Sequence, residues 1–180
     1  MELLNAEAEK LRTLVHDWYT HPEQELEATF GSRGQVSLTE FLRISQRLRG
    51  KGFRAEPQED KLNIILPEKL RFTLTGLGMI QQYCRDDSLA DKPFTAMIKD
   101  RTAIESTIDM NEYDMRVKSR REIDVDPEEG QVRGALSQWA QQKKAFRLIR
   151  RWTYFAKGFR IDMSMVRSTA KDQRGTYRWQ

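Results

Sequence analysis

Apolar residues recur along the chain with two periods, which mark the expected helices and strands. Steps of three and four residues over residues 2–19 and 37–48 predict two amphipathic helices. The first ends at Thr20-His21-Pro22, and the second opens with the capping box Ser37-Leu38-Thr39-Glu40. Shorter helical patterns cover residues 78–84 and 132–142, and Cys84 is expected to be a small buried apolar residue in the first of these.

Alternation of polar and apolar residues predicts the strands. It covers residues 24–31, 53–56, 62–66, 70–75, 110–124, 145–157, 159–169 and 175–180. Residues 94–99 fit a strand and a helical turn equally well. Strand, helix, several hairpin-like strands, helix and strands in this order are typical of an α+β protein with a mostly antiparallel sheet.

In at least four of these strands one face carries charged or polar residues and the other is apolar. Because strand side chains alternate, Glu25 and Glu27 share a face, with Leu26 and Ala28 on the other. The same alternation groups further residues strand by strand: Arg71 with Thr73, then Arg116 with Lys118 and Arg120, then Arg147 with Arg151. If the sheet curls closed with helices outside, these faces would line a lumen of acids and bases.

Such a lumen would suit a metal-bound polyphosphate ester. Carboxylates such as Glu25 and Glu27 bind hard cations, Mg²⁺ or Mn²⁺, whose shells are completed by water and phosphate oxygens. Basic side chains hold the phosphates and stabilise charge in phosphoryl transfer. Two other interpretations stay open: an exposed edge strand with solvated glutamates, and solvated basic strands that bind RNA without specificity.

Composition limits the alternatives. The chain has 180 residues, a net charge of +4, a single cysteine and two histidines. One domain over residues 1–180 is therefore expected, in a reducing compartment, with no disulfide and no histidine–cysteine zinc site. No signal peptide and no apolar run long enough to span a bilayer is present, so no membrane partner is expected. Residues 130–161 hold eight Lys or Arg and no Asp or Glu, which predicts an anionic partner.

Two common phosphate-handling motifs are absent. There is no Gly-rich loop followed by Lys-Ser or Lys-Thr, which argues against a P-loop enzyme. Cys84 is followed directly by Arg85 and does not have the Cys-x5-Arg spacing of a cysteine phosphatase.

Five segments together resemble a known family. They are Glu25-Leu-Glu27-Ala-Thr-Phe-Gly31, Arg71-Phe-Thr73, Asn111-Glu-Tyr-Asp-Met-Arg116-Val-Lys118, Phe146-Arg147-Leu-Ile-Arg150-Arg151 and Phe159-Arg160-Ile-Asp162-Met-Ser164-Met-Val166. In this order they are similar to the RNA 5′-triphosphatase domain of mRNA capping enzymes of large DNA viruses. That domain is related to the fungal metal-dependent RNA triphosphatases, and both belong to the triphosphate tunnel metalloenzymes.

The resemblance implies a function and residue roles. The reaction would be hydrolysis of the γ-phosphate from triphosphate-ended nascent mRNA, which leaves a diphosphate end for guanylylation. Glu25 and Glu27 would bind Mg²⁺ or Mn²⁺, and Asp162 would orient a basic residue. The triphosphate would be held by Arg71, Thr73, Arg116, Lys118, Arg120, Arg147, Arg151 and Arg160. It also implies association with guanylyltransferase and methyltransferase domains, and a location in the host cytoplasm or virion.

The sequence departs from the family pattern in two places. Thr29 stands where the family usually has Lys or Arg. The family also has a second acidic strand near the end of the domain, whereas Asp172 is the only acid after Asp162. A truncated domain, a piece of a longer capping enzyme or a degenerate copy is expected. The alternatives are a triphosphatase of the same superfamily acting on small-molecule or inorganic triphosphate, and a non-catalytic triphosphate- or RNA-binding remnant.

Overall fold

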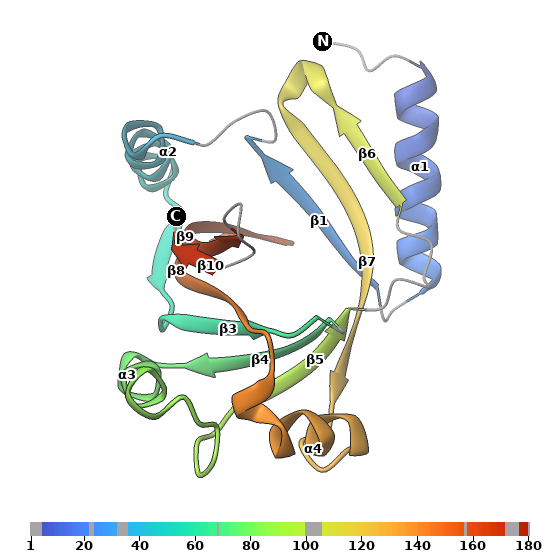
Figure 1. Cartoon of the computed structure of the whole chain (residues 1–180). Coiled ribbons are helices and arrows are strands. Elements are labelled where there is room, and N and C mark those ends of the chain that lie inside the picture. Colours follow the sequence, from blue (N-terminus) through green and yellow to red (C-terminus); the bar gives the residue numbers. More distant parts are fainter. Residues whose placement is uncertain are drawn as a thin grey trace. The chain divides into compact units, whose positions relative to one another are not determined.

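A computed structural model of the chain describes residues 5–21, 24–31, 36–67, 69–99, 106–156, 158–171 and 177–179. The helices are α1 (Asn5–Thr20), α2 (Leu38–Gly50), α3 (Leu77–Asp86) and α4 (Gly130–Ser137), with short 3-10 helices η1 (Asn111–Tyr113) and η2 (Trp139–Gln141). The strands are β1 (Gln24–Phe30), β2 (Arg54–Pro57), β3 (Lys61–Ile65), β4 (Leu70–Thr75), β5 (Thr95–Lys99), β6 (Ser106–Met110), β7 (Met115–Val125), β8 (Ala145–Ala156), β9 (Phe159–Lys171) and β10 (Tyr177–Trp179). Figure 1 shows these elements.

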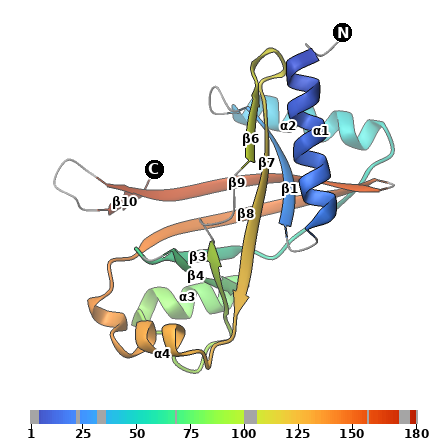
Figure 2. The same cartoon turned by 90° about the vertical axis from the view of Figure 1, so that its right-hand side faces the viewer.

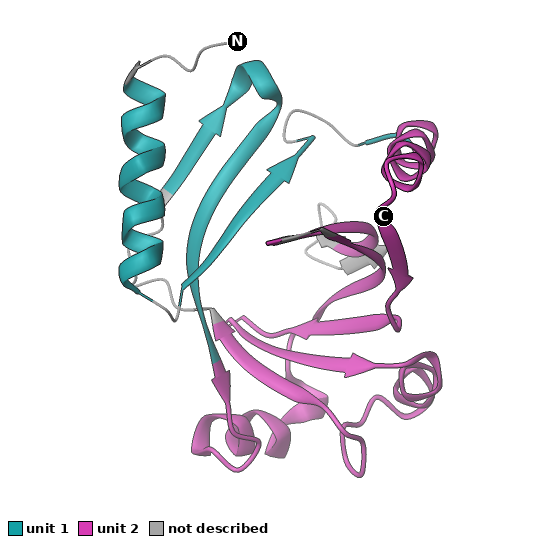
Figure 3. Ribbon diagram, turned by 180° about the vertical axis from the view of Figure 1, so that it is seen from behind, with its two compact units in different colours: residues 1–37, 99–123 teal, residues 38–98, 124–180 magenta. Residues whose placement is uncertain are grey.

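The chain divides into two compact units (Figure 3). The first comprises Met1–Ser37 and Lys99–Ile123, and the second comprises Leu38–Ile98 and Asp124–Gln180. In both units every described strand pair is antiparallel, and helices pack on the strands. The predicted α+β class with an antiparallel sheet is confirmed.

The first unit is a three-stranded sheet with one helix on it. β7 pairs with β1 on one side and with β6 on the other. On the apolar face, Leu14 of α1 is buried against Ile108, Met110 and Val117. Because α1 covers this face, the alternate residues of β1 and β7, the charged ones, lie on the opposite face.

The second unit is built on a longer sheet. Its strand order is β5-β4-β3-β8-β9-β10, and β2 pairs with β8 beyond the end of β3. Figure 2 shows β8 and β9 as long paired strands, whose register runs from Arg147 opposite Ser168 to Ala156 opposite Phe159. On one face of this hairpin polar residues pair across the two strands, among them Arg151 with Ser164 and Thr153 with Asp162.

Helices cover the other face of the second unit. Phe72 is fully buried there and makes edge-on ring contacts with Phe94 and Trp139, at centroid distances of 5.5 and 5.2 Å. α2 packs on the same face of β8, where its Ser45 hydroxyl lies 2.6 Å from the Tyr154 hydroxyl. The polar face of β8 is therefore the face that these helices leave uncovered.

An ion pair joins the start of β3 to β8. Arg150 donates to both carboxylate oxygens of Asp60, at 3.0 and 2.8 Å, and these hydrogen bonds lower the pKa of Asp60 below its usual value of 3.8. A carboxylate with a lowered pKa stabilises the fold above its unfolded-state pKa, and this contribution is lost as the pH falls through the folded-state pKa.

The difference in unfolding free energy between the wild type and the Asp60→Asn variant is expected to show this pH dependence. At pH 7 it should lose about 1 kcal/mol of unfolding free energy, a modest value because the Arg150 side chain is 58% exposed. At a pH below the lowered folded-state pKa of Asp60 the difference from the wild type should shrink towards zero, because Asp60 is then protonated. Urea unfolding at both pH values measures it, and an equal loss at both would contradict the assignment.

Several predicted elements are corrected. The strand predicted over residues 110–124 begins later than expected, as β7 at Met115. Met110 instead ends β6, and the chain reverses through η1 and Asp114, which adopts a left-handed backbone conformation (φ 47°). The helix predicted over residues 132–142 breaks into α4 and η2. Cys84 is exposed, because Ile80 and Tyr83 form the buried side of α3. Residues 94–99, whose sequence fits a strand and a helical turn equally well, contain strand β5.

None of the helices in the described ranges is long and apolar enough to cross a membrane. Asp172, which was singled out as the only acid after Asp162, lies outside the described residues.

Candidate active site

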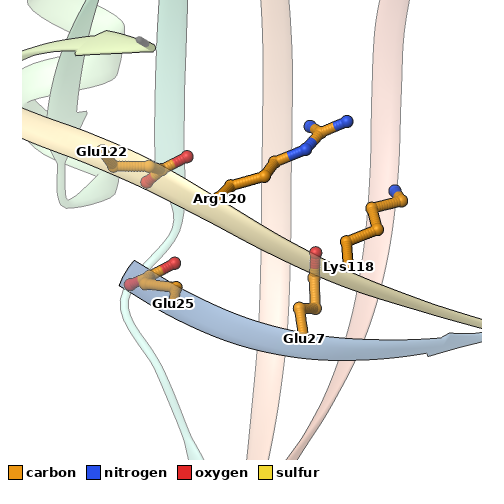
Figure 4. Close-up of a pocket in the computed structure, with 5 residues that line it drawn as sticks. All are labelled: Glu25, Glu27, Lys118, Arg120 and Glu122. Carbon is orange, nitrogen blue, oxygen red and sulfur yellow. The ribbon is translucent and has the colours of Figure 1, made fainter. Parts of the chain in front are cut away.

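The first unit presents an acidic and basic surface on the open face of β1 and β7. In the register of these strands Glu25 lies opposite Arg120, and Glu27 lies opposite Lys118. These four residues and Glu122 line one small hollow (Figure 4). Opposite charges on directly facing positions attract each other, so the two carboxylates and the two cations stabilise one another's placement.

Glu122 is an acid that the sequence analysis did not single out. It is the next residue after Arg120 that points to the same face of β7, and in Figure 4 it lies on the side of Glu25. The sequence shows that Glu122 shares a strand face with Lys118 and Arg120. Only the pairing of β7 with β1 shows that Glu122 lies near Glu25.

The carboxylates of this hollow suit part of a metal site. In the described ranges, no group of three or more His, Cys, Asp or Glu side chains is arranged to hold a metal ion. Glu25 and Glu27 are both exposed and have oxygen ligands of the kind that Mg²⁺ and Mn²⁺ prefer. Mg²⁺ is often held by one or two carboxylates together with water and substrate phosphates, so this donor set fits a metal that a phosphate ligand helps to bind.

Arg116 lies on the same face but is held by an acid. Asp109 of β6 is directly opposite Arg116 of β7, and the arginine donates to both carboxylate oxygens, one of them at 2.9 Å. These hydrogen bonds lower the pKa of Asp109 and raise that of Arg116. Asp109 was missed because the predicted strand began at Met110, so β6 was not expected as a neighbour of β7.

In the second unit, a polar row crosses four strands. Asn63 of β3 faces Thr73 of β4 on one side and Arg147 of β8 on the other, and Ser168 of β9 faces Arg147. Asn63 is 5% exposed, and its side-chain oxygen accepts a hydrogen bond of 3.0 Å from the Thr73 hydroxyl. Arg71 projects from the same face of β4, two residues before Thr73.

Asn63 was also missed by the sequence analysis. It alternates with the buried Leu62 and Ile64, so its direction could be read from the chain. Its position between Thr73 and Arg147 depends on the pairing of β3 with β4 and with β8, which cannot be predicted from the sequence alone.

A second polar cluster is centred on Asp162 of β9. Arg151 donates to Ser164 Oγ through Nε and to Asp162 Oδ2 through Nη1, each at 3.0 Å. The Thr153 hydroxyl donates to Asp162 Oδ1 at 2.8 Å, and Arg160 Nη2 lies 3.3 Å from Asp162 Oδ2. The guanidinium of Arg151 is thus held in one orientation by two side chains, which is the kind of preorganisation that anion binding requires.

The predicted site residues thus fall into two groups. Glu25, Glu27, Arg116, Lys118 and Arg120 share one face in the first unit, and Arg71, Thr73, Arg147, Arg151, Arg160 and Asp162 share one face in the second. Within each unit, the alternation predicted from the sequence places them together.

Comparison with known proteins identifies the fold. No family model and no curated protein matches the chain. Solved structures of the mimivirus mRNA capping enzyme do match, one of them of the RNA triphosphatase domain of this trifunctional enzyme, with a TM-score of 0.68 and 16% identity over 92% of this chain and 80% of that one.

Two further structures of the mimivirus capping enzyme triphosphatase give the same result. The monoclinic form has a TM-score of 0.69 and 15% identity over 99% of this chain and 88% of that one, and the triclinic form has values of 0.66 and 17% over 92% and 80%. At this identity the likeness concerns the fold. The chain therefore shares the fold of the RNA triphosphatase domain of the mimivirus mRNA capping enzyme.

Proposed function

We propose that the protein is a metal-dependent RNA 5′-triphosphatase, which removes the γ-phosphate from triphosphate-ended RNA and leaves a diphosphate end. The observation that carries this proposal is the Glu25 and Glu27 pair facing Arg120 and Lys118 on one strand face, in a chain with the fold of such a domain. A site with acids for a metal and bases for phosphates suits phosphoryl transfer to water.

The metal would be Mg²⁺ or Mn²⁺, held by Glu25 and Glu27. Bound there, it would polarise phosphate oxygens and favour attack by water. The basic side chains would bind the triphosphate and balance the charge that develops on the γ-phosphate. In this role we place Arg71, Arg116, Lys118, Arg120, Arg147, Arg151 and Arg160, with Asp162 orienting Arg151. The neutral hydroxyl of Thr73 would add a hydrogen bond to the triphosphate.

A consequence of the two-carboxylate donor set is that metal and triphosphate should bind together. Since water and phosphate oxygens would supply the remaining ligands, Mn²⁺ alone is expected to bind weakly, and a non-hydrolysable triphosphate analogue should tighten its binding. Titration of Mn²⁺ with and without the analogue, followed by electron paramagnetic resonance, measures this. Equal Mn²⁺ affinity in both titrations would contradict a shared site.

The activity is tested with a short RNA labelled at the γ-phosphate. Release of labelled phosphate is expected with Mg²⁺ or Mn²⁺ and not with EDTA, and the same RNA labelled at the β-phosphate should release nothing. ATP and inorganic triphosphate in parallel distinguish an RNA enzyme from a small-molecule triphosphatase. Absence of release from all three substrates would overturn the proposal.

Binding to RNA separates the remaining alternative. A non-catalytic RNA-binding protein should bind 5′-hydroxyl and 5′-triphosphate RNA equally and lose affinity steeply with salt. A triphosphatase should prefer the triphosphate end, because its cations are arranged around that group.

A further inference from the structure

An exposed aromatic residue lies on the polar face of β8. Phe155 is 47% exposed and follows Arg151 and Thr153 at steps of two, so it points to the face that carries the Asp162 cluster. The helix α2 lies on the other face, where Phe41 contacts Trp152 at a centroid distance of 5.6 Å. The exposure of Phe155 therefore belongs to the polar face and not to the helix-covered core.

Two arginines flank this ring. In the register of the strands, Phe155 lies directly opposite Arg54 of β2 and directly opposite Arg160 of β9. Directly opposite residues of an antiparallel pair have Cβ atoms about 5 Å apart and share a face. The side chains of Arg54 and Arg160 are 85% and 63% exposed. We call these three residues the Arg54–Phe155–Arg160 row.

The row is continuous with the cluster that holds Arg151. Arg160 contacts Asp162 at 3.3 Å, and Asp162 accepts a hydrogen bond from Arg151. Phe155 is four residues along β8 from Arg151, which corresponds to about 13 Å at a rise of about 3.3 Å per residue. A phosphate held at Arg151 would leave room for the rest of a nucleotide along the hairpin towards Phe155.

This combination fits one chemical class of ligand. An aromatic face between cations is the usual platform for an unpaired nucleobase, because the ring stacks on any base and the cations neutralise neighbouring phosphates. Resting on the proposed triphosphatase function, we infer that the Arg54–Phe155–Arg160 row binds the first nucleoside of the triphosphate-ended substrate. Phe155 stacks on the base, and the two arginines hold the phosphates on either side of that nucleoside.

The row would make the enzyme selective for nucleotides. Inorganic triphosphate has no base and gains nothing from Phe155, whereas triphosphate-ended RNA and ATP both have a first nucleoside. The Phe155→Ala variant is therefore expected to raise the KM for RNA and for ATP by about 5- to 150-fold, the range of stacking effects on alanine substitution. Its KM for inorganic triphosphate should stay that of the wild type.

Matched variants separate stacking from a general effect on the hairpin. Phe155→Tyr keeps an aromatic ring, so its KM for RNA should stay close to that of the wild type. Met165→Ala removes a side chain that is 40% exposed on the opposite face of the same hairpin and should change no KM. Arg54→Ala should weaken RNA binding at low salt. The slope of log affinity against log salt concentration should also fall by about one, the value for one lost phosphate contact.

Several outcomes would overturn the inference. They are an unchanged RNA KM in Phe155→Ala, an equal rise for inorganic triphosphate, or an effect on RNA without an effect on ATP. If the wild type hydrolyses nothing, the proposed function fails, and the row is then judged by calorimetric binding of the same three ligands. Loss of RNA and ATP affinity in Phe155→Ala with unchanged affinity for inorganic triphosphate would still support it, and any other pattern would overturn it.

Discussion

Glu25→Gln and Glu27→Gln are each expected to slow metal-dependent phosphate release by about a hundredfold or more. The amide keeps the shape of the side chain but loses the anionic oxygen that a hard cation requires, and a catalytic metal contributes several kcal/mol of charge stabilisation. Initial rates of γ-phosphate release under saturating RNA, over a range of Mn²⁺ concentrations, measure the effect. If the residues hold the metal, more Mn²⁺ should partly restore the rate.

The control for these variants is Glu112→Gln. Glu112 is an exposed glutamate of η1 in the same unit, and it does not line the hollow around Glu25. The same change of charge there should leave the rate and its Mn²⁺ dependence unaltered. Wild-type rates in both Glu25→Gln and Glu27→Gln would show that the pair is a solvated surface feature.

Arg151→Lys is expected to lower kcat by about a hundredfold, with a smaller change in KM. Arg151 is held by Ser164 and Asp162, so its guanidinium is oriented before a phosphate arrives. Lysine keeps the charge but cannot make the same two directed hydrogen bonds, and losing one preorganised donor typically costs about a hundred- to a thousandfold in rate. Single-turnover rates with RNA separate this effect from product release.

Asp162 should act through Arg151, as a positioning residue. Asp162→Asn removes the charge that the arginine contacts and is expected to lower kcat less than Arg151→Lys does. In the double variant the two effects should fall well short of adding, because both disturb one arginine. Fully additive effects would contradict the positioning role.

Arg150→Lys is the matched control on the same strand. Arg150 neighbours Arg151 but points to the opposite face, where it binds Asp60. The same chemical change there should affect stability slightly and leave kcat unaltered. Equal losses of kcat at both positions would indicate a general disturbance of β8 and not a phosphate contact.

Much of the fold could be predicted from local patterns. The alternation around Glu25, Arg71, Lys118 and Arg151 correctly indicated which residues share a strand face, because side-chain direction in a strand has a period of two and depends only on neighbours in the chain. The apolar faces were found in the same way, and Phe72 and Val117 are buried as their strand patterns indicate. The antiparallel α+β class followed from the order of these elements.

The pairing of distant strands could not be read in this way. Asp109 holds Arg116 only because β6 folds back on β7 through the left-handed Asp114, and Asn63 lies between Thr73 and Arg147 only through the register of β3. Register is set by loops and by packing across the sheet, so it is a property of several strands together.

The same physical difference explains the two findings that matter most for function. The charges of Glu25 and Glu27 and their common strand face are properties of one short segment. Both can therefore be predicted from the sequence alone. The Arg54–Phe155–Arg160 row brings Arg54 beside two hairpin residues about 100 positions later in the chain, and Phe155 is an ordinary strand residue until β2 and β9 pair with β8. Local alternation determines where each side chain points, whereas non-local pairing decides which side chains meet.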